Sequence, residues 1–189
     1  MFSAFLDANV LVPVTLTDTI LRCAERELFA PLWSRRVLEE ASRAVLRIRP
    51  GLSPSRVEYR FACMHQSFRE ASVENYEGLV EKVVLPDADD RHVVAAASMG
   101  SADLIVTRNL KHFPKAELTR FGLEVVSPDR FLCDMLDLAP AIVYDAVKSQ
   151  ANDAQIPHRT VDDVLIGLGR AGATEFVAAF RASVQKKAE

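Results

Sequence analysis

The chain has 189 residues, of which 49% are hydrophobic and 26% are charged, and its formal net charge is -3. These values fit one compact domain with room for an appendage. They exclude a global electrostatic attraction to nucleic acid or to anionic lipid, so a nucleic-acid-binding protein of this composition needs a local basic patch.

The cysteines and the apolar runs indicate the compartment. Cys23, Cys63 and Cys133 are widely spaced and form no CxxC pair, which argues against a disulfide framework and a zinc site and suits a reducing cytosol. The start MFSAFLDANVLVP has no basic region and is interrupted by Asp7, unlike a signal peptide. No run reaches the roughly 18 apolar residues of a membrane span. We therefore expect a cytoplasmic protein with no membrane association.

Short apolar runs alternate with helical patterns over the first two thirds of the chain. The runs predict strands at residues 2–6, 28–33, 80–85, 103–107 and 122–127. Helices are expected from Thr17 or Asp18 to Leu28, after Ser34, from Ser53-Pro54 to about Glu70, after Asp87 or Asp89 up to Gly100, and from Ser127-Pro128 to about Leu136. Apolar strands that alternate with helices indicate a parallel sheet covered on both faces.

The pattern changes at Pro140, after which no strand is expected. Three helical stretches follow at 140–150, 160–169 and 173–186, and Thr160 with Asp163 resembles a capping box. We therefore predict an α/β domain over residues 1–138 and a helical C-terminal extension over residues 139–189.

Polar residues follow several of the predicted strands at their carboxyl ends. Asp7 and Asn9 come after the first strand, Thr107, Arg108 and Asn109 come after strand 103–107, and Asp87, Asp89 and Asp90 lie between a strand and its helix. Ligands of open α/β sheets bind outside the carboxyl ends of the strands, so these residues are expected at one rim.

Glu40 is a further acidic candidate, in the helix after Ser34. It lies near the apolar stripe of that helix, whereas Glu39 points further toward solvent. A carboxylate beside a core face is costly unless it is paired or ligated. Gathering Asp7, Glu40 and Asp90 is costly too, because two carboxylates about 4 Å apart repel by roughly 4 kcal/mol at an effective dielectric near 20. An oxygen-only ligand set favours Mg²⁺ or Mn²⁺, which suits hydrolysis of a phosphodiester.

Simpler structural roles are also open for these residues. Asp87, Asp89 and Asp90 can serve as helix caps, and Asn109 can satisfy turn backbone. His92 and His112 are expected at the surface or beside the ligands rather than as ligands themselves.

Four segments together resemble PIN-domain ribonucleases, most closely bacterial toxins of the VapC type. They are FLDANVLVP, SRRVLEE, LPDADDRHVVAAASMGSADLIVTRNLKHFP and GLEVVSPDRFL. The resemblance spans about residues 2–136. It implies a PIN-like three-layer α/β/α sandwich with a mostly parallel sheet of strand order 3-2-1-4-5, and an acidic pocket that binds Mg²⁺ or Mn²⁺.

The resemblance also assigns roles to residues. Asp7, Glu40 and Asp90 take the positions of metal-binding and catalytic acids, and Asn109 stands where many PIN domains have a fourth acid. Asn9, Asp87, Asp89 and Thr107 are expected to support the ligands. The implied mechanism is attack of a metal-oriented water on an RNA phosphodiester, with Glu40 holding or deprotonating that water.

Substrate binding needs basic residues near this rim. Arg35, Arg36, Arg108 and Lys111 are the candidates for RNA contact, and the targets implied are tRNA or mRNA. Arg43, Arg47 and Arg49 form another basic group, which either binds RNA or is a solvated face. The resemblance further implies a small antitoxin partner and a homodimer.

Two other functions compete with the ribonuclease. The substitution of an acid by Asn109 is compatible with a degenerate PIN scaffold that binds RNA or protein without cleavage. A haloacid-dehalogenase phosphatase requires a second aspartate two positions after the first, where this chain has Asn9.

Overall fold

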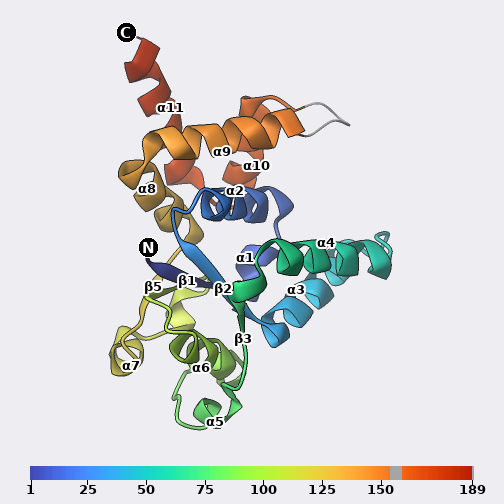
Figure 1. Ribbon diagram of the computed structural model, residues 1–189, viewed down its shortest axis with the longest axis vertical. Helices are drawn as coiled ribbons and strands as arrows, with labels where there is room; N and C mark the ends of the chain where they lie inside the picture. Colours follow the sequence, from blue (N-terminus) through green and yellow to red (C-terminus); the bar gives the residue numbers. More distant parts are fainter. Residues whose placement is uncertain (154–158, 189) are drawn as a thin grey trace. The chain divides into compact units, whose positions relative to one another are not determined.

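The computed structural model describes residues 1–153 and 159–188 of the chain, which Figure 1 traces from the N-terminus to the C-terminus. The chain forms two compact units. Unit 1 comprises Met1–Val12 and Ala30–Val126, and unit 2 comprises Pro13–Phe29 and Ser127–Glu189. The proposed domain division between residues 138 and 139 stays a prediction, and residues 154–158 and 189 of the proposed extension lie outside the described residues.

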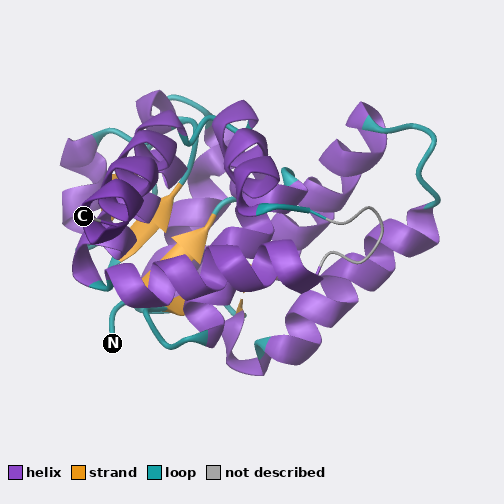
Figure 2. Cartoon of the chain, turned by 90° about the horizontal axis from the view of Figure 1, so that it is seen from above, coloured by secondary structure: helices purple, strands orange, loops and turns teal. Residues whose placement is uncertain are grey.

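Unit 1 contains a five-stranded sheet in which all pairs are parallel. Its strands are β1 (Ser3–Leu6), β2 (Ala30–Ser34), β3 (Ser72–Val73), β4 (Leu104–Val106) and β5 (Glu124–Val126), in the order β3-β2-β1-β4-β5. In the central strand, Phe5 is in register with Leu32 on one side and Ile105 on the other. Helices predominate in the chain as a whole (Figure 2). The predicted strand order and the predicted PIN-like α/β sandwich are confirmed.

The predicted strand at 80–85 was wrong. Val80 instead ends a short helix, α5 (Glu77–Val80), and the third strand lies earlier, at β3. Val83 and Leu85 are buried, but the backbone N–H of Val84 donates to the Glu117 carboxylate at 2.9 Å and not to a neighbouring strand. Burial of two alternate side chains therefore produced a strand-like pattern without strand pairing.

Three helices of unit 1 lie largely where the sequence predicts them: α3 (Arg35–Ile48), α4 (Pro54–Ser67) and α6 (Arg91–Met99). The short helices α1 (Ala8–Leu11), α5 and α7 (Lys115–Arg120) were not predicted. Short 3-10 turns are η1 (Arg69–Ala71), η2 (Ala88–Asp90) and η3 (Leu110–His112). The Ser34 hydroxyl caps α3 by accepting from the N–H of Val37 at 3.3 Å. The α6 helix contacts strands β1 to β4, and its residues from Val93 to Ala97 are buried in the core.

Gly100 ends α6, as predicted, but for reasons of packing. Its φ of -77° is accessible to any residue. A Cβ at this position, however, would lie 2.6 Å from Cγ2 of Val73 and 3.3 Å from Cδ1 of Leu32. The glycine therefore allows α6 to end close against β2 and β3.

Unit 2 consists of helices α2 (Val14–Glu25), α8 (Pro128–Leu138), α9 (Pro140–Asp153), α10 (Val161–Arg170) and α11 (Thr174–Ala188). The α2 helix begins before the predicted Thr17 or Asp18. Thr17 does not cap it, because both its N–H and its hydroxyl donate to the carbonyl of Pro13 at 3.0 Å. The helix also ends before the predicted Leu28, since Glu27 has a φ of 59°.

Buried polar and aromatic contacts join the helices of unit 2. The Thr19 hydroxyl of α2 donates to the Gln150 amide oxygen of α9 at 2.5 Å, and Phe29 packs edge-on against Phe131 of α8. The Asp129 carboxylate accepts N–H groups from the first turn of α11. The predicted capping box at the start of α10 is present. Within residues 1–153 and 159–188, no helix is long and apolar enough to cross a membrane.

Candidate active site

A groove of about 590 Å³ lies at the carboxyl ends of β1 and β4 in unit 1. All four predicted catalytic residues line it, and they come from four separate segments: Asp7, Glu40, Asp90 and Asn109. Their convergence follows from the parallel sheet, which places the loops after β1 and β4 at the same edge. The structure thus brings these side chains together, and their catalytic roles stay a prediction.

Asp7 lies deepest in the groove and is 4% exposed. One carboxylate oxygen accepts the N–H of Ala8 at 2.6 Å, which caps α1. The other accepts from the Thr107 hydroxyl at 2.6 Å and from the Asn9 amide at 2.5 Å. Burial raises the pKa of Asp7 more than the bonds from Thr107 and Ala8 lower it, and the charge of Asp90 raises the pKa further.

Thr107 and Asn9 join the loops after β1 and β4. The buried Thr107 hydroxyl accepts the Asn9 amide at 3.0 Å and the Asn109 N–H at 3.1 Å, in addition to its bond to Asp7. The Asn9 amide oxygen accepts the N–H of Arg108 at 2.9 Å. This network fixes the backbone that carries Asn109. The Asn109 side chain makes no hydrogen bond with any residue that the structure describes.

Two side chains, those of Arg36 and His92, contact the same carboxylate oxygen of Glu40. Arg36 donates to Oε1 at 3.0 Å from the preceding turn of α3, and Nε2 of His92 lies 3.2 Å from the same oxygen. Burial raises the pKa of Glu40, but His92 and Arg36 together outweigh it, so the pKa lies below its ordinary value of 4.5. Among the described residues nothing donates to Oε2, which is left to accept from a water or to ligate a cation.

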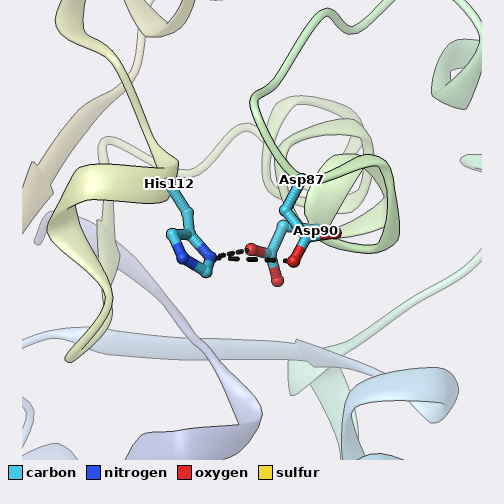
Figure 3. Close-up of side chains that lie close together, drawn as sticks. All are labelled: Asp87, Asp90 and His112. Atoms are coloured by element: carbon cyan, nitrogen blue, oxygen red, sulfur yellow. Dashed lines mark hydrogen bonds and ion pairs between the residues drawn. The ribbon is translucent and has the colours of Figure 1, made fainter.

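Asp90 belongs to a second small cluster, with Asp87 and His112 (Figure 3). Nδ1 of His112 lies 2.7 Å from one oxygen of Asp90 and 4.0 Å from the Asp87 carboxylate. The three side chains each offer a ligand atom, and these atoms lie within 4.8 Å of one another. His112 therefore fixes the orientation of Asp90, whose second oxygen has no partner within the described part of the chain.

Other predicted site residues lie outside the groove lining. The Asp87 carboxylate accepts the N–H of Asp89 at 3.0 Å and so caps η2. The Asp89 side chain is exposed, and its carbonyl is 3.5 Å from Arg36. Arg35 is 91% exposed and pairs with Glu39 at 2.9 Å. Lys111 is exposed on η3.

Sequence reasoning placed less weight on four residues that the structure brings to the site. His92 is 2% exposed and not at the surface, and it contacts Glu40. His112 contacts Asp90, while Arg43 and Arg47 line the groove. The helical period could have identified the arginines, because they lie three and seven residues after Glu40 and so share its face.

The groove has the donor set of a site for a divalent cation. Asp7 is a buried carboxylate near the charge of Asp90, and the raised pKa shows that its ionised form lacks full compensation. A bound cation would supply that compensation. Carboxylate and amide oxygens favour Mg²⁺ or Mn²⁺, and a nitrogen ligand from His112 would favour Mn²⁺ over Mg²⁺.

Two family models match this chain. The family model described as "PIN domain" matches residues 3–111, and the model described as "VapC50 C-terminal domain" matches residues 128–182. A Mycobacterium tuberculosis protein named "Putative ribonuclease VapC50" is 40% identical over 77 residues, which cover 39% of this chain and 46%, about half, of that protein. No solved structure matches the chain significantly. Because the first model covers more than half of the chain, the chain belongs to the PIN domain family.

Proposed function

We propose that this protein is a metal-dependent endoribonuclease that hydrolyses RNA phosphodiester bonds as the toxin of a toxin–antitoxin pair. The observation that carries the proposal is the convergence of Asp7, Glu40, Asp90 and Asn109 in one groove. Membership of the PIN domain family and the similarity to a protein named as a ribonuclease support the same conclusion.

Asp7, Asp90 and Glu40 would hold Mg²⁺ or Mn²⁺. When bound, such an ion neutralises charge on the phosphate and lowers the pKa of a bound water. The protein residues act around this centre. Thr107 and Asn9 hold the Asp7 carboxylate in place, and His112 does the same for Asp90.

Glu40 is suited to orienting the attacking water. Its low pKa keeps it ionised at neutral pH, and its free Oε2 can accept a hydrogen bond from that water. A strongly ionised carboxylate is a weak base, so this environment favours holding the water over storing its proton. The uncharged amide of Asn109 can accept from water or a cation but adds no negative charge, which limits the affinity for a second metal ion.

Single-stranded or looped RNA is the proposed substrate, from either tRNA or mRNA. Arg108 lines the groove, and Arg36 lies beside Glu40. Arg35 and Lys111 lie outside the lining and would contact only an RNA that extends past the groove. We propose a small antitoxin as the protein partner, a homodimer as the assembly and the cytoplasm as the location, all on the basis of the likeness to VapC-type toxins.

Cleavage of a mixed tRNA and mRNA pool by purified protein tests the activity. We expect discrete products with Mn²⁺ or Mg²⁺, no products with EDTA, and loss of cleavage in Asp90→Asn and Glu40→Gln. Glu39→Gln is the matched control, since Glu39 is the neighbouring acid on α3 and, among the residues described, pairs with Arg35 alone at the surface. It should cleave like the wild type.

The same experiment distinguishes the binding-scaffold alternative, which the replacement of an acid by Asn109 favours. Folded, partner-free protein that binds the RNA pool but cleaves nothing with either metal would support a scaffold. Equal activity in Glu40→Gln and Glu39→Gln would remove Glu40 from the mechanism.

A further inference from the structure

Two arginines extend the site along α3, away from the acids. Arg43 and Arg47 line the same groove as Glu40, and they follow it by three and seven residues. An α-helix rises about 1.5 Å per residue, so their Cα atoms lie about 4.5 and 10.5 Å beyond that of Glu40 along the helix axis. The three side chains therefore form one row that begins at the predicted catalytic acid.

Neither arginine is neutralised by a residue that the structure describes. No carboxylate of the described residues lies within 4.0 Å of Arg43 or Arg47, although Arg35 and Arg36 on the same helix are each paired with a glutamate. Arg108, which lines the groove from the loop after β4, is also unpaired in the described part of the chain, and its backbone is fixed by Asn9. A groove that holds acids at one end and three unpaired guanidinium groups is suited to an extended polyanion.

The rest of the lining indicates how such a ligand is held. The apolar residues there are Ala8, Val12, Ala44 and Ile48, and no aromatic side chain belongs to the lining as the structure describes it. Stacking of bases on aromatic rings is therefore not a source of affinity in this groove, which leaves the phosphates as the main point of contact.

We propose that Arg43 and Arg47, together with Arg108, form a phosphate-binding track that holds the single-stranded RNA substrate on one side of the scissile bond. This inference rests on the proposed ribonuclease function and adds the direction in which the substrate leaves the acids. Arg43, nearer to Glu40, contacts a phosphate close to the cleaved bond, and Arg47 contacts one further along the strand.

Binding of a fluorescent single-stranded oligouridine, followed by anisotropy in EDTA, tests the track without cleavage. The variants are Arg43→Gln, Arg47→Gln and, as the matched control, Arg49→Gln, which removes the same charge from the exposed end of α3 outside the groove. We expect binding by Arg43→Gln and Arg47→Gln to be about three- to ten-fold weaker, with little change in Arg49→Gln. Each groove variant should also reduce the slope of log K against log salt by about 0.7, the value for one phosphate contact on a single strand.

Cleavage with Mn²⁺ in parallel separates this inference from the proposed function. The track predicts a higher KM with nearly unchanged kcat in Arg43→Gln and Arg47→Gln. Equal loss of affinity in all three variants, unchanged salt slopes in the groove variants, or no RNA binding by the wild type would each overturn the track. If the wild type cleaves nothing but the groove variants alone lose RNA binding, the track is retained and the nuclease function is refuted. If both groove variants bind and cleave RNA normally, the track is refuted and the nuclease function is retained.

Discussion

The contact between Glu40 and His92 gives a prediction that can be worked through in detail. Replacing His92 with Phe keeps a ring in the buried position but removes the group 3.2 Å from Oε1 of Glu40. A hydrogen bond to a charged group contributes about 1.5–3 kcal/mol to stability. Glu40 is 28% exposed and retains Arg36 on the same oxygen, so solvent screening and this remaining partner reduce our expectation to about 1 kcal/mol.

The sign of the effect should depend on whether Glu40 is present. Nδ1 of His92 is buried and has no partner among the described residues, so the imidazole carries a desolvation cost. Without Glu40, its other nitrogen loses its partner too. We therefore expect His92→Phe to destabilise the wild type but to be neutral or stabilising in a Glu40→Ala background, with a coupling energy of about 1 kcal/mol at pH 7.

The coupling should also depend on pH. The folded pKa of Glu40 lies below the ordinary value of 4.5, so its ionised form is favoured in the folded protein. The resulting stabilisation is complete above about pH 4.5, the ordinary pKa of the unfolded state. It is lost as the pH falls through the lower pKa of the folded state. The coupling in the double-mutant cycle should diminish over that acidic range.

Urea unfolding followed by tryptophan fluorescence provides the assay. Trp33 is the single tryptophan, and it is fully buried in β2, so its emission reports on unit 1. A coupling energy under about 0.3 kcal/mol at pH 7 is indistinguishable from independent sites and would refute the reasoning. A coupling that stays constant well below pH 4.5 would show that the Glu40 charge is not its source.

Three further predictions test other parts of the structure. Gly100→Ala should lower the stability of unit 1 by about 1–3 kcal/mol in the same fluorescence assay, because the new Cβ would overlap the stiff side chain of Val73; wild-type stability would contradict the packing argument. Thr19→Val should lower the melting temperature measured by circular dichroism, because it leaves the buried Gln150 oxygen without its 2.5 Å donor, at a cost of about 1–3 kcal/mol. Ser55→Ala, which removes an exposed hydroxyl, should leave the melting temperature unchanged. Burial raises the pKa of Cys23 to about 12 and that of Cys133 to about 11. At pH 8 a disulfide reagent should therefore label Cys63 first. Early labelling of Cys23 would instead show that α2 opens readily.

The residue pattern was sufficient to predict the parallel sheet, whereas its strand order was predicted from the resemblance to PIN domains. Apolar runs such as FSAFL and DLIVT are short, continuous and bounded by polar residues, which is typical of a strand covered on both faces. The strand at 80–85 failed because its pattern reflects burial of Val83 and Leu85 alone. The true edge strand, Ser72–Val73, is too short for any periodicity to be visible.

The candidate site was predictable to a similar degree. The positions of Asp7 and Asn109 follow from strand ends, and that of Glu40 from helical spacing. The roles of the two histidines were not predictable, because each depends on a long-range contact between different elements. His92 reaches Glu40 from α6, and His112 reaches Asp90 from η3, neither of which leaves a mark in local sequence.

The division of the chain between its two units has a consequence for synthesis. The α2 helix belongs to unit 2, yet it lies more than 100 residues ahead of the helices α9 and α10 that it contacts. On the ribosome, α2 therefore emerges early and keeps an apolar face exposed while strands β2 to β5 of the sheet are still being made. The nascent protein can complete this helical unit only after the segment from Ser127 onward has left the exit tunnel. Until then, the unfinished chain carries an uncovered hydrophobic helix that lies between β1 and β2 in the sequence.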